Sequence, residues 1–458
     1  MRPGRRRVLL GGAAVLAAVI GAGLLLPHPK APSRVPERIS SAQIEDVLVE
    51  PPAGTPVGLA AIVSDAGGTG PAEHALGDAL RARGLIVLQL DWARWRAALD
   101  RETTPCIRPI VDVELLAKEA QRTLKGQSYL RPVLVGRGEG GTLVEAILSR
   151  ALPATLGGGV ALDPAVALRT VRPLCDDAAP VAAAVSLPEG GFAYPLPARS
   201  QAQLTIVSAE AAPAPPEPAP GAGPFAVERH AEPDPARRSA AALDAAAAIA
   251  AQDAGTGGLP LVDLPAVGRT RAVALFVSGD GGWRDIDKTI GERLTREGIH
   301  VVGLDALRYY WTDRDPKAVA ADVAAMLQEA DPGKTLPVMV LGYSFGADLF
   351  PFSWPYLPAS LRDRIRLIAL LAPSRSTGFS VSVKGWLGLG GEHAVVPQLA
   401  ALPADRVLCI HGSKETDSPC RDPSLAATRK LLIDGGHHFD GDYPAIARRI
   451  VEAARLPE

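Results

Sequence analysis

Short apolar runs alternate with helix-length segments along most of this chain. In the C-terminal half, AVALFVSGDGGWRD (272–285), LPVMVLGYSFGA (336–347) and DRVLCIHGSKE (405–415) each carry a run rich in Val, Ile, Leu or Met, followed by a turn containing Gly, Ser or Asp. The segment 315–330, between two of these runs, has the length of a helix. This alternation predicts a mostly parallel sheet covered by helices on both faces.

The N-terminal half repeats the same signals in the same order. GLAAIVSDAGGTG (58–70), RPVLVGRGEGG (131–141) and AQLTIVSAE (202–210) parallel the three runs above. The repetition predicts a chain of two tandem α/β domains. We expect them at residues 40–252 and 260–458, joined by a linker at 253–259 and preceded by an N-terminal segment at 1–39.

The first residues have the pattern of a membrane-targeting segment. MRPGRRR is followed by nineteen uncharged, mostly apolar residues, Val8 to Leu26, which as a helix would span about 28 Å. The arginines favour a cytoplasmic N-terminus, so the body of the chain is expected in the periplasm. The segment is either a signal anchor that tethers the protein to the inner membrane, which we favour, or a cleaved signal peptide.

Composition narrows the classes of partner. The formal net charge is −2 and no basic stripe follows the first seven residues, so nucleic acid is not an expected ligand. The four cysteines lie two in each half, and an exported protein is expected to pair them as disulfides, Cys106 with Cys175 and Cys409 with Cys420. The sequence has no C-x-x-C cluster, and we expect neither a metal nor a cofactor.

The run LPVMVLGYSFGADLF carries the pattern G-x-S-x-G between a predicted strand and a predicted helix. A strand, a sharp turn and a helix are the setting of a nucleophile elbow, in which the serine stands exposed at the end of the strand. Gly342 and Gly346 allow the turn to be tight. Ser344 is therefore the candidate nucleophile.

A serine hydroxyl needs a base to take its proton and an acid to orient that base. Downstream, LLIDGGHHFDGDYP places His437 and His438 between a predicted strand and the last helix, and we favour His438. The acid is expected just after the strand RVLCI, where Glu415 is the first choice and Asp417 the second.

A tetrahedral intermediate also needs hydrogen-bond donors for its oxyanion. One is expected from the backbone N–H of Phe345, the residue after the nucleophile. The other is expected from the loop after the strand AVALFV, at the N–H of Asp280 or Gly279.

The first domain lacks the nucleophile. Its counterpart of Ser344 is Gly138, although Glu210 and His230 stand near the positions of an acid and a base. The simplest interpretation is a duplicated hydrolase whose first copy lost its chemistry and kept its fold. Such a copy is expected to serve as a binding, docking or regulatory module.

The motifs FVSGDGGWRDID, LGYSFGADLFPF and GGHHFD resemble the bacterial virulence protein family known as VirJ and AcvB. The two-copy arrangement is similar to the longer, AcvB-type members. The resemblance implies two α/β-hydrolase-like domains, the first degenerate, a periplasmic location and hydrolysis of lysyl-phosphatidylglycerol. It also implies that Ser344 is the nucleophile and His438 the base. The short VirJ members are linked to type IV secretion.

A lysyl ester carries two ammonium groups, so its pocket is expected to present carboxylates. The candidates are Asp280, Asp285, Asp348 and Asp440, and Trp283 is a candidate contact for the lipid. The expected partner is thus an aminoacylated phospholipid of the inner membrane. Two alternatives remain: a broader periplasmic esterase or lipase, and a non-catalytic adaptor of a type IV secretion system whose first domain binds a secretion or periplasmic partner.

Overall fold

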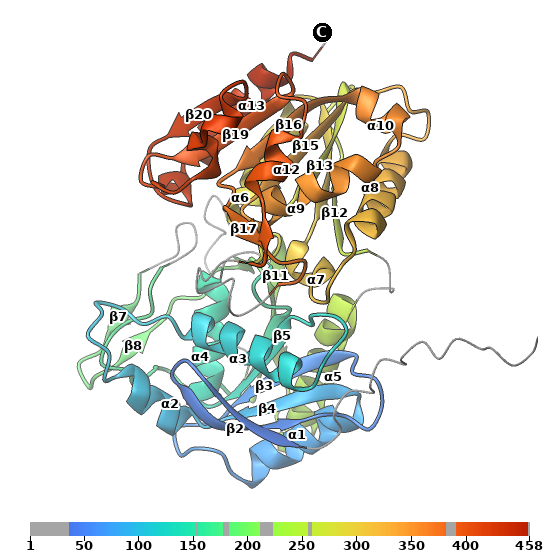
Figure 1. The fold of residues 1–458 in the computed structure, drawn as a ribbon. Helices are drawn as coiled ribbons and strands as arrows, with labels where there is room; N and C mark the ends of the chain where they lie inside the picture. The colour runs from blue at the N-terminus through green and yellow to red at the C-terminus, as the bar shows by residue number, and fades with distance from the viewer. Residues whose placement is uncertain are drawn as a thin grey trace, which may run out of the picture.

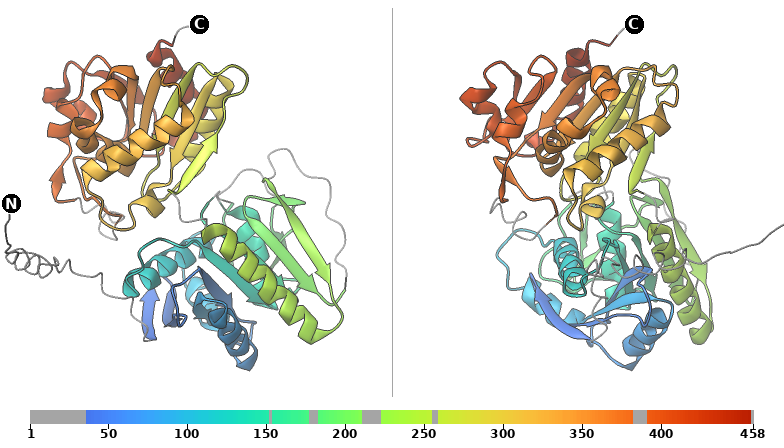
Figure 2. Two further views of the ribbon diagram at one scale, coloured as in Figure 1. Left: turned by 90° about the vertical axis from the view of Figure 1, so that its right-hand side faces the viewer. Right: turned by 45° about the vertical axis from the view of Figure 1, so that its right-hand side comes forward.

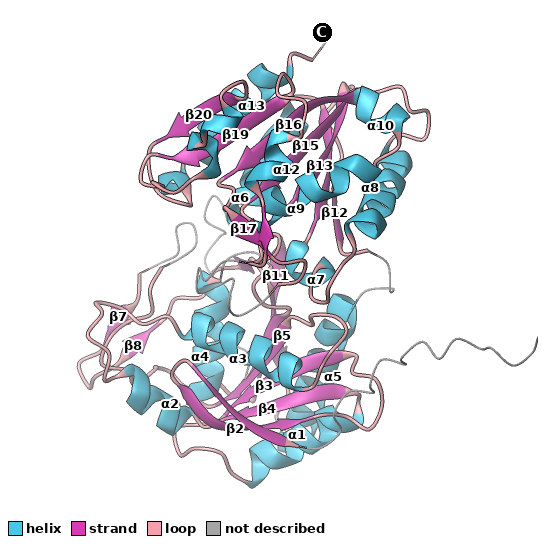
Figure 3. Cartoon of the chain, viewed as in Figure 1, coloured by secondary structure: helices cyan, strands magenta, loops and turns pink. Residues whose placement is uncertain are grey.

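A computed structural model describes residues 36–151, 154–176, 183–210, 223–254, 259–381 and 391–456. These residues form two α/β units, the first at the bottom of Figure 1 in blue to green and the second at the top in yellow to red. Each unit is a sheet with helices packed on both of its faces (Figure 3).

Within the described residues the sheet of the first unit has nine strands, in the order β1-β2-β4-β3-β5-β6-β10-β11-β9. The six strands from β4 to β11 pair in parallel, and β1, β2 and β9 pair antiparallel at the edges. Helices α1 and α5 cover one face, and α2, α3 and α4 cover the other. The bounds are β1 Glu37–Ser41, β2 Ile44–Glu50, β3 Gly58–Val63, α1 Pro71–Ala82, β4 Leu85–Leu90, α2 Trp92–Leu99, α3 Pro109–Thr123, β5 Pro132–Arg137, α4 Glu139–Arg150, β6 Gly158–Leu162, β7 Val185–Ser186, β8 Phe192–Ala193, β9 Arg199–Ser200, β10 Gln203–Ser208, β11 Phe225–Ala231 and α5 Pro235–Ala254.

The sheet of the second unit has seven strands within the described residues, in the order β12-β14-β13-β15-β16-β19-β20. Only the edge strand β12 is antiparallel to its neighbour. Helices α6 and α13 cover one face, and α7, α8, α9, α10 and α12 cover the other. The bounds are β12 Leu261–Leu264, β13 Ala272–Val277, α6 Asp285–Arg296, β14 Ile299–Leu304, α7 Ala306–Tyr309, α8 Pro316–Ala330, β15 Val338–Tyr343, α9 Phe345–Ser353, α10 Ala359–Arg364, β16 Ile365–Leu371, β17 Ser376–Thr377, β18 His393–Ala394, α12 Val396–Ala400, β19 Val407–Gly412, β20 Arg429–Ile433 and α13 Tyr443–Ala454.

Strand β13 shows why apolar runs form the centre of each sheet. Val273 and Leu275 belong to the core on the α8 side, whereas Ala274 and Phe276 belong to the core on the α6 side. All six residues of the strand are buried. A strand covered on both faces must be apolar at every position, so it reads as a continuous run rather than as an alternating one.

The two units share one topology. The strands β2-β4-β3-β5-β6-β10-β11 of the first unit follow the same order and directions as β12-β14-β13-β15-β16-β19-β20 of the second. The fold of both is α/β-hydrolase-like, with a mostly parallel sheet flanked by helices. The carboxyl ends of neighbouring parallel strands meet at one edge of such a sheet, which is where its ligand sites form.

The predicted membrane segment, Val8 to Leu26, lies outside the described residues. Among the residues that the structure does describe, no helix combines the length and the apolar character needed to cross a bilayer.

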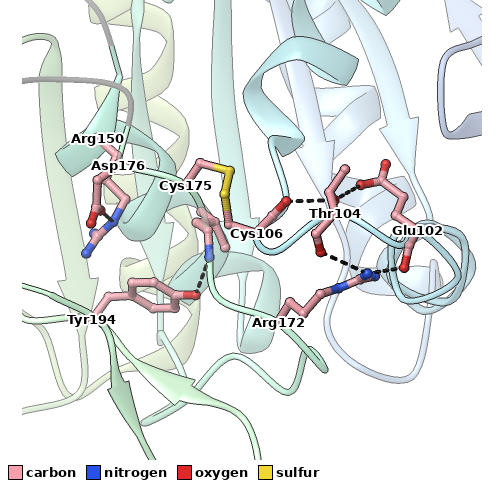
Figure 4. Close-up of a disulfide and its surroundings, with 9 residues drawn as sticks. Glu102, Thr104, Cys106, Arg150, Arg172, Cys175, Asp176 and Tyr194 are labelled. Carbon is pink, nitrogen blue, oxygen red and sulfur yellow. Dashed lines mark hydrogen bonds and ion pairs between the residues drawn. A yellow bond between two sulfur atoms is a disulfide. The ribbon is translucent and has the colours of Figure 1, made fainter.

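Both expected disulfides are present. Cys106 and Cys175 join the segment before α3 to the segment after β6, 69 positions apart (Figure 4). Around this bond, Thr104 Oγ1 donates to the carbonyl of Cys106 at 2.8 Å, and the Tyr194 hydroxyl accepts the N–H of Leu174 at 3.1 Å. Cys409 on β19 pairs with Cys420, 11 positions later, and so closes the loop after that strand.

The end of α3 and the loop after it contact the second unit. Tyr129 is 1% exposed and packs on Trp311, with ring centroids 5.1 Å apart. The guanidinium of Arg122 lies 3.6 Å from the centroid of the Trp311 ring and donates to the Trp311 carbonyl at 2.6 Å. In both views of Figure 2 the second unit lies above the first.

Candidate active site

Ser344 stands on a sharp turn between β15 and α9. Its backbone has φ 50° and ψ −117°, a conformation that non-glycine residues rarely adopt. A Cβ atom on Gly342 would lie 2.6 Å from the carbonyl oxygen of Gly346, and one on Gly346 would lie 2.3 Å from the carbonyl oxygen of Val277. Only glycine fits either position, which explains the G-x-S-x-G spacing.

His437 bridges the serine and an acid. Its Nε2 atom lies 2.8 Å from Ser344 Oγ, and its Nδ1 atom lies 2.8 Å from Glu415 Oε1. With a proton on Nδ1 donated to Glu415, Nε2 is free to accept the serine proton, as a general base requires. The second carboxylate oxygen of Glu415 accepts the N–H of Gly412 at 2.8 Å, which fixes the carboxylate against the end of β19.

The preference for His438 as the base is corrected by this geometry. His438 Nδ1 lies 3.1 Å from the hydroxyl of Tyr343, the residue before the nucleophile, and the rings of His437 and His438 are nearly perpendicular at 88°. Consecutive residues of a turn project in different directions, and positive φ angles at Phe439 and Asp440 tighten this turn. Burial lowers the pKa of His438, which favours the neutral ring.

Glu415, the first choice for the acid, is the carboxylate that contacts His437. Burial opposes its ionisation, but the hydrogen bonds from His437 and from the N–H of Gly412 outweigh this and lower the pKa of Glu415. Asp417, the second choice, has an 88% exposed side chain and pairs with Arg375 at 2.9 Å. Asp417 is thus a carboxylate of the pocket rim rather than a partner of the histidine.

The first unit carries an anion in the position that corresponds to the predicted oxyanion hole. Gly138 has φ 54° and ψ −122°, so the elbow turn survives there without a serine. Close by, one oxygen of the Asp65 carboxylate accepts the N–H of Ala66 at 2.7 Å and the N–H of Glu139, the residue after Gly138, at 2.9 Å. Two backbone donors thus converge on one negative oxygen.

The second unit has the same loop with the carboxylate removed. Ser64 and Ser278 occupy equivalent places, because each hydroxyl accepts the N–H of the first residue of the helix after the next strand, Trp92 of α2 or Ala306 of α7. Asp65 therefore corresponds to Gly279, and the two donors correspond to the N–H groups of Asp280 and Phe345. Of the two residues that the sequence left open for the second donor, this comparison indicates Asp280.

The candidate triad opens on a pocket of about 760 Å³. Its lining includes two basic side chains of the Lys and Arg type, Lys414 and Arg375, against six acidic ones: Asp280, Asp313, Asp348, Glu392, Glu415 and Asp417. The described part of the pocket therefore presents an excess of carboxyl groups, which suits a cationic ligand.

Two of these carboxyls have perturbed pKa values. Burial raises the pKa of Asp280, and the charges of Lys118, His437 and Arg284 offset this only in part. Burial also raises the pKa of Asp348 well above its usual value. The hydrogen bond that Asp348 accepts from the N–H of Ser374 at 2.6 Å lowers the pKa but does not offset the effect of burial. Both groups would ionise more readily beside a bound cation.

The remaining predicted binding residues are placed elsewhere. Asp285 is exposed at the start of α6, and Asp440 is exposed and pairs with Lys414 at 3.1 Å. Trp283 is 5% exposed and packs edge-on against Phe276 in the core. Within the described residues none of the three lines the pocket, so the expectation that they bind substrate is wrong for this pocket.

Among its described residues, the first unit has no histidine placed as His437 is in the second. His230 lies within β11 and pairs with Val207 in the sheet, whereas His437 follows β20, the equivalent strand. The suggestion that His230 occupies the place of a base is therefore wrong. Glu210 follows β10 at the edge of a stretch that the structure does not describe.

Sequence reasoning missed several residues of this site. Tyr343 donates its hydroxyl to the His437 carbonyl at 3.2 Å and so ties the histidine loop to the elbow. Its place inside G-x-S-x-G was a usable signal. Asp313 and Glu392 come from loops without a motif. His393, whose ring stacks on Phe379 with centroids 4.3 Å apart, begins the short strand β18.

One comparison with known proteins, that with protein families, is placed on the second unit. Residues 271–457 match the family model of the bacterial virulence protein VirJ. No curated protein matches the chain. Among solved structures, the esterase EaEST from Exiguobacterium antarcticum is 15% identical, with 43% of this chain and 94% of that chain covered at a TM-score of 0.33. Est1E from Butyrivibrio proteoclasticus, with ferulic acid bound, is 14% identical, with 43% of this chain and 95% of that chain covered at a TM-score of 0.31.

TT1662 from Thermus thermophilus is 16% identical, with 44% of this chain and 95% of that chain covered at a TM-score of 0.32. At such scores and identities these likenesses support no statement about activity. The family match is of a different kind, because it spans the elbow serine, the acid loop and the histidine loop together. Residues 271–457, which hold Ser344, Glu415 and His437, are therefore the part of the chain that is similar to the bacterial virulence protein VirJ.

Proposed function

We propose that the protein is a periplasmic serine hydrolase that cleaves the aminoacyl ester of lysyl-phosphatidylglycerol to lysine and phosphatidylglycerol. The reaction type rests on one observation, the hydrogen-bonded series from Ser344 through His437 to Glu415, with both distances at 2.8 Å. The location rests on the N-terminal export pattern and on the family.

The chemistry follows the geometry of the site. Ser344 Oγ attacks the lysyl carbonyl carbon while its proton passes to His437 Nε2, and Glu415 stabilises the resulting imidazolium. The N–H groups of Phe345 and Asp280 hold the oxyanion, where a single donor is worth about 3 kcal/mol. The bond to the glycerol oxygen then breaks, and that oxygen takes the proton from His437. Water, activated in the same way, releases lysine from the acyl-enzyme.

The choice of a cationic acyl group rests on the carboxyl-rich pocket. Asp280 and Asp348 line it, and burial raises the pKa of each. An ammonium group beside them would favour ionisation and would be paired at the same time. A neutral acyl group would form no ion pair with these carboxyls.

Purified protein mixed with vesicles of phosphatidylglycerol and lysyl-phosphatidylglycerol tests the proposal through the release of free lysine. We expect turnover by the wild type and none by Ser344→Ala. Equal turnover by both proteins would contradict the mechanism. Equal rates on lysyl-phosphatidylglycerol and on a neutral ester of the same lipid would support the broader esterase instead. A wild type that a fluorophosphonate leaves unlabelled would support the adaptor.

A further inference from the structure

A buried cluster of charges crosses the boundary between the two units beside the candidate oxyanion loop. Glu114 on α3 accepts a hydrogen bond from the Nη2 atom of Arg284, which precedes α6. Lys118, one turn further along α3, lies with its Nζ atom 2.7 Å from the same carboxylate oxygen. The Glu114 and Lys118 side chains are only 11% and 5% exposed.

The same guanidinium reaches the loop that carries a candidate oxyanion donor. Arg284 Nε donates to the carbonyl of Gly281 at 2.7 Å. That carbonyl belongs to the loop 279–282, which contains the Asp280 N–H. The Arg284 side chain therefore joins a carboxylate of the first unit to the backbone of the oxyanion loop, and both hydrogen bonds come from one rigid planar group.

At the position of Arg284 the first unit has no side chain that could hold its own copy of the loop. Gly70 occupies the place of Arg284, because its N–H donates to Glu73 at 2.9 Å as the N–H of Arg284 donates to Asp287 at 3.1 Å. A glycine has no side chain with which to hold the loop. There, the Asp65 carboxylate binds the two backbone donors instead. The loop of the second unit has Gly279 at the position of Asp65, so no carboxylate at that position holds its two donors.

The charges around Glu114 favour its ionised form and therefore its ion pair with Arg284. Burial opposes the ionisation of Glu114, but the charges and hydrogen bonds of Arg284 and Lys118 outweigh it and lower the pKa of Glu114. Removing one member of such a buried group of charges leaves the others without a partner and strongly destabilises the fold. The three side chains are therefore expected to stay together even where their net contribution to stability is small.

We propose that helix α3 of the first unit completes the catalytic site of the second, with Glu114 as a positioning residue that holds Arg284 against the oxyanion loop. The proposal rests on the proposed serine hydrolase activity. It gives the first unit, which lacks a nucleophile, a role in the reaction: its docked α3 keeps the Asp280 N–H aimed at the oxyanion. It predicts that a change in the first unit alters kcat in the second.

Full-length Glu114→Gln, assayed with p-nitrophenyl acetate and a fluorophosphonate, tests this. We expect kcat to fall about 10- to 100-fold, somewhat less than the loss of a whole oxyanion donor, with KM within about threefold of the wild type. The phosphonate oxygen also binds the oxyanion hole, so the labelling rate should fall by a similar factor. A folded Glu114→Gln with wild-type kcat and labelling rate would overturn the proposal.

Two further variants separate positioning from folding. Glu114→Gln/Lys118→Met keeps the net charge of the buried cluster, so it is expected to fold even if Glu114→Gln does not. It should show the same fall in kcat. A wild-type kcat in this variant would also overturn the proposal. Gln201→Ala removes another hydrogen bond between the units, that of Lys288 at 3.3 Å, and should stay within about twofold of the wild type. If kcat of Gln201→Ala fell as far as kcat of Glu114→Gln, any weakened contact between the units would explain the loss. That result would overturn the specific role of Glu114. An unlabelled wild type would instead contradict the hydrolase itself.

Discussion

His437 Nε2 lies 2.8 Å from Ser344 Oγ, while the adjacent His438 directs its Nδ1 atom to the hydroxyl of Tyr343 at 3.1 Å. Two neighbouring histidines thus have separate environments. The first contacts the candidate nucleophile, and the second contacts the tyrosine that precedes it.

Substitution of each histidine separates these roles. We expect His437→Gln to lower kcat for p-nitrophenyl acetate by a factor of about 10⁴ or more, since no base would then take the serine proton. His438→Gln should lose at most about tenfold, because it removes only a hydrogen bond to Tyr343. Steady-state kinetics and fluorophosphonate labelling measure both. The reverse ranking would restore His438 as the base.

Glu415→Gln should reduce kcat by about 10⁴-fold, because an amide no longer selects the His437 tautomer with a proton on Nδ1. Asp417→Asn is the matched control: its carboxylate is exposed and pairs with Arg375, so kcat should change less than about threefold. Comparable losses in the two variants, measured with the same ester, would argue against Glu415 as the orienting acid.

The lowered pKa of Glu415 has a consequence for stability. A carboxylate whose folded pKa lies below its unfolded value stabilises the fold above the unfolded pKa and loses that contribution as the pH falls through the folded pKa. Urea unfolding should therefore show wild type more stable than Glu415→Gln at pH 7, with the difference shrinking below pH about 4.5. A difference that grows in acid would contradict the assignment.

Gly279→Asp should close the oxyanion hole of the second unit from within, as Asp65 closes that of the first. In the first unit the carboxylate accepts both backbone N–H groups, at 2.7 and 2.9 Å. We expect kcat to fall by about 10²- to 10³-fold, the usual effect of losing an oxyanion donor. Gly279→Ala is the control: its Cβ would lie 3.2 Å from the Tyr343 ring, a small adjustment. Equal kcat values for the two variants would contradict the assignment of the Asp280 and Phe345 N–H groups as the oxyanion donors.

Asp287→Asn should stabilise the protein at alkaline pH. Burial raises the pKa of Asp287 to about 8, so the folded state binds a proton that the unfolded state has released. The native carboxyl therefore lowers stability progressively as the pH rises from about 4 to 8. The asparagine can still accept the N–H of Arg284 without carrying charge. The gain in Tm should reach several degrees at pH 9 and vanish near pH 4; a gain independent of pH would contradict this.

The Cys409–Cys420 disulfide should contribute to activity as well as to stability, because it closes the loop that carries Glu415. Replacing both cysteines by serine should cost about 3 kcal/mol of unfolding free energy and lower kcat. The Cys106→Ser/Cys175→Ser pair opens a longer loop in the first unit and should cost about 4 kcal/mol while the triad contacts persist. A wild-type kcat in the Cys409→Ser/Cys420→Ser variant would show that the disulfide is not needed to position Glu415.

The fold and much of the site could be predicted because their signals are local. Continuous apolar runs such as Ala272–Val277 must be strands covered on both faces, and their repetition in order predicts two equivalent sheets. The elbow around Ser344 is also local, since its glycines are required by contacts of less than 3 Å within the turn and its neighbouring strand.

The choice between close alternatives could not be predicted. His437 and His438 are adjacent and chemically identical, and only the path of the turn after β20 decides which ring meets Ser344. Glu415 and Asp417 differ by two positions, and the partner Arg375, which engages Asp417, comes from another strand connection. Orientation depends on contacts between segments far apart in the chain, which a linear pattern does not contain.

The amino-acid sequence by itself determined the α/β class, the duplication, the elbow serine and the region of its acid and base, because spacing and apolar periodicity encode backbone turns and buried faces. Only the tertiary structure decided which histidine faces the serine, that Asp65 occupies the first unit's anion hole, and that Glu114 reaches Arg284 across 170 positions. Those relationships arise when separate segments pack together, and packing in three dimensions is what sets the direction of a side chain.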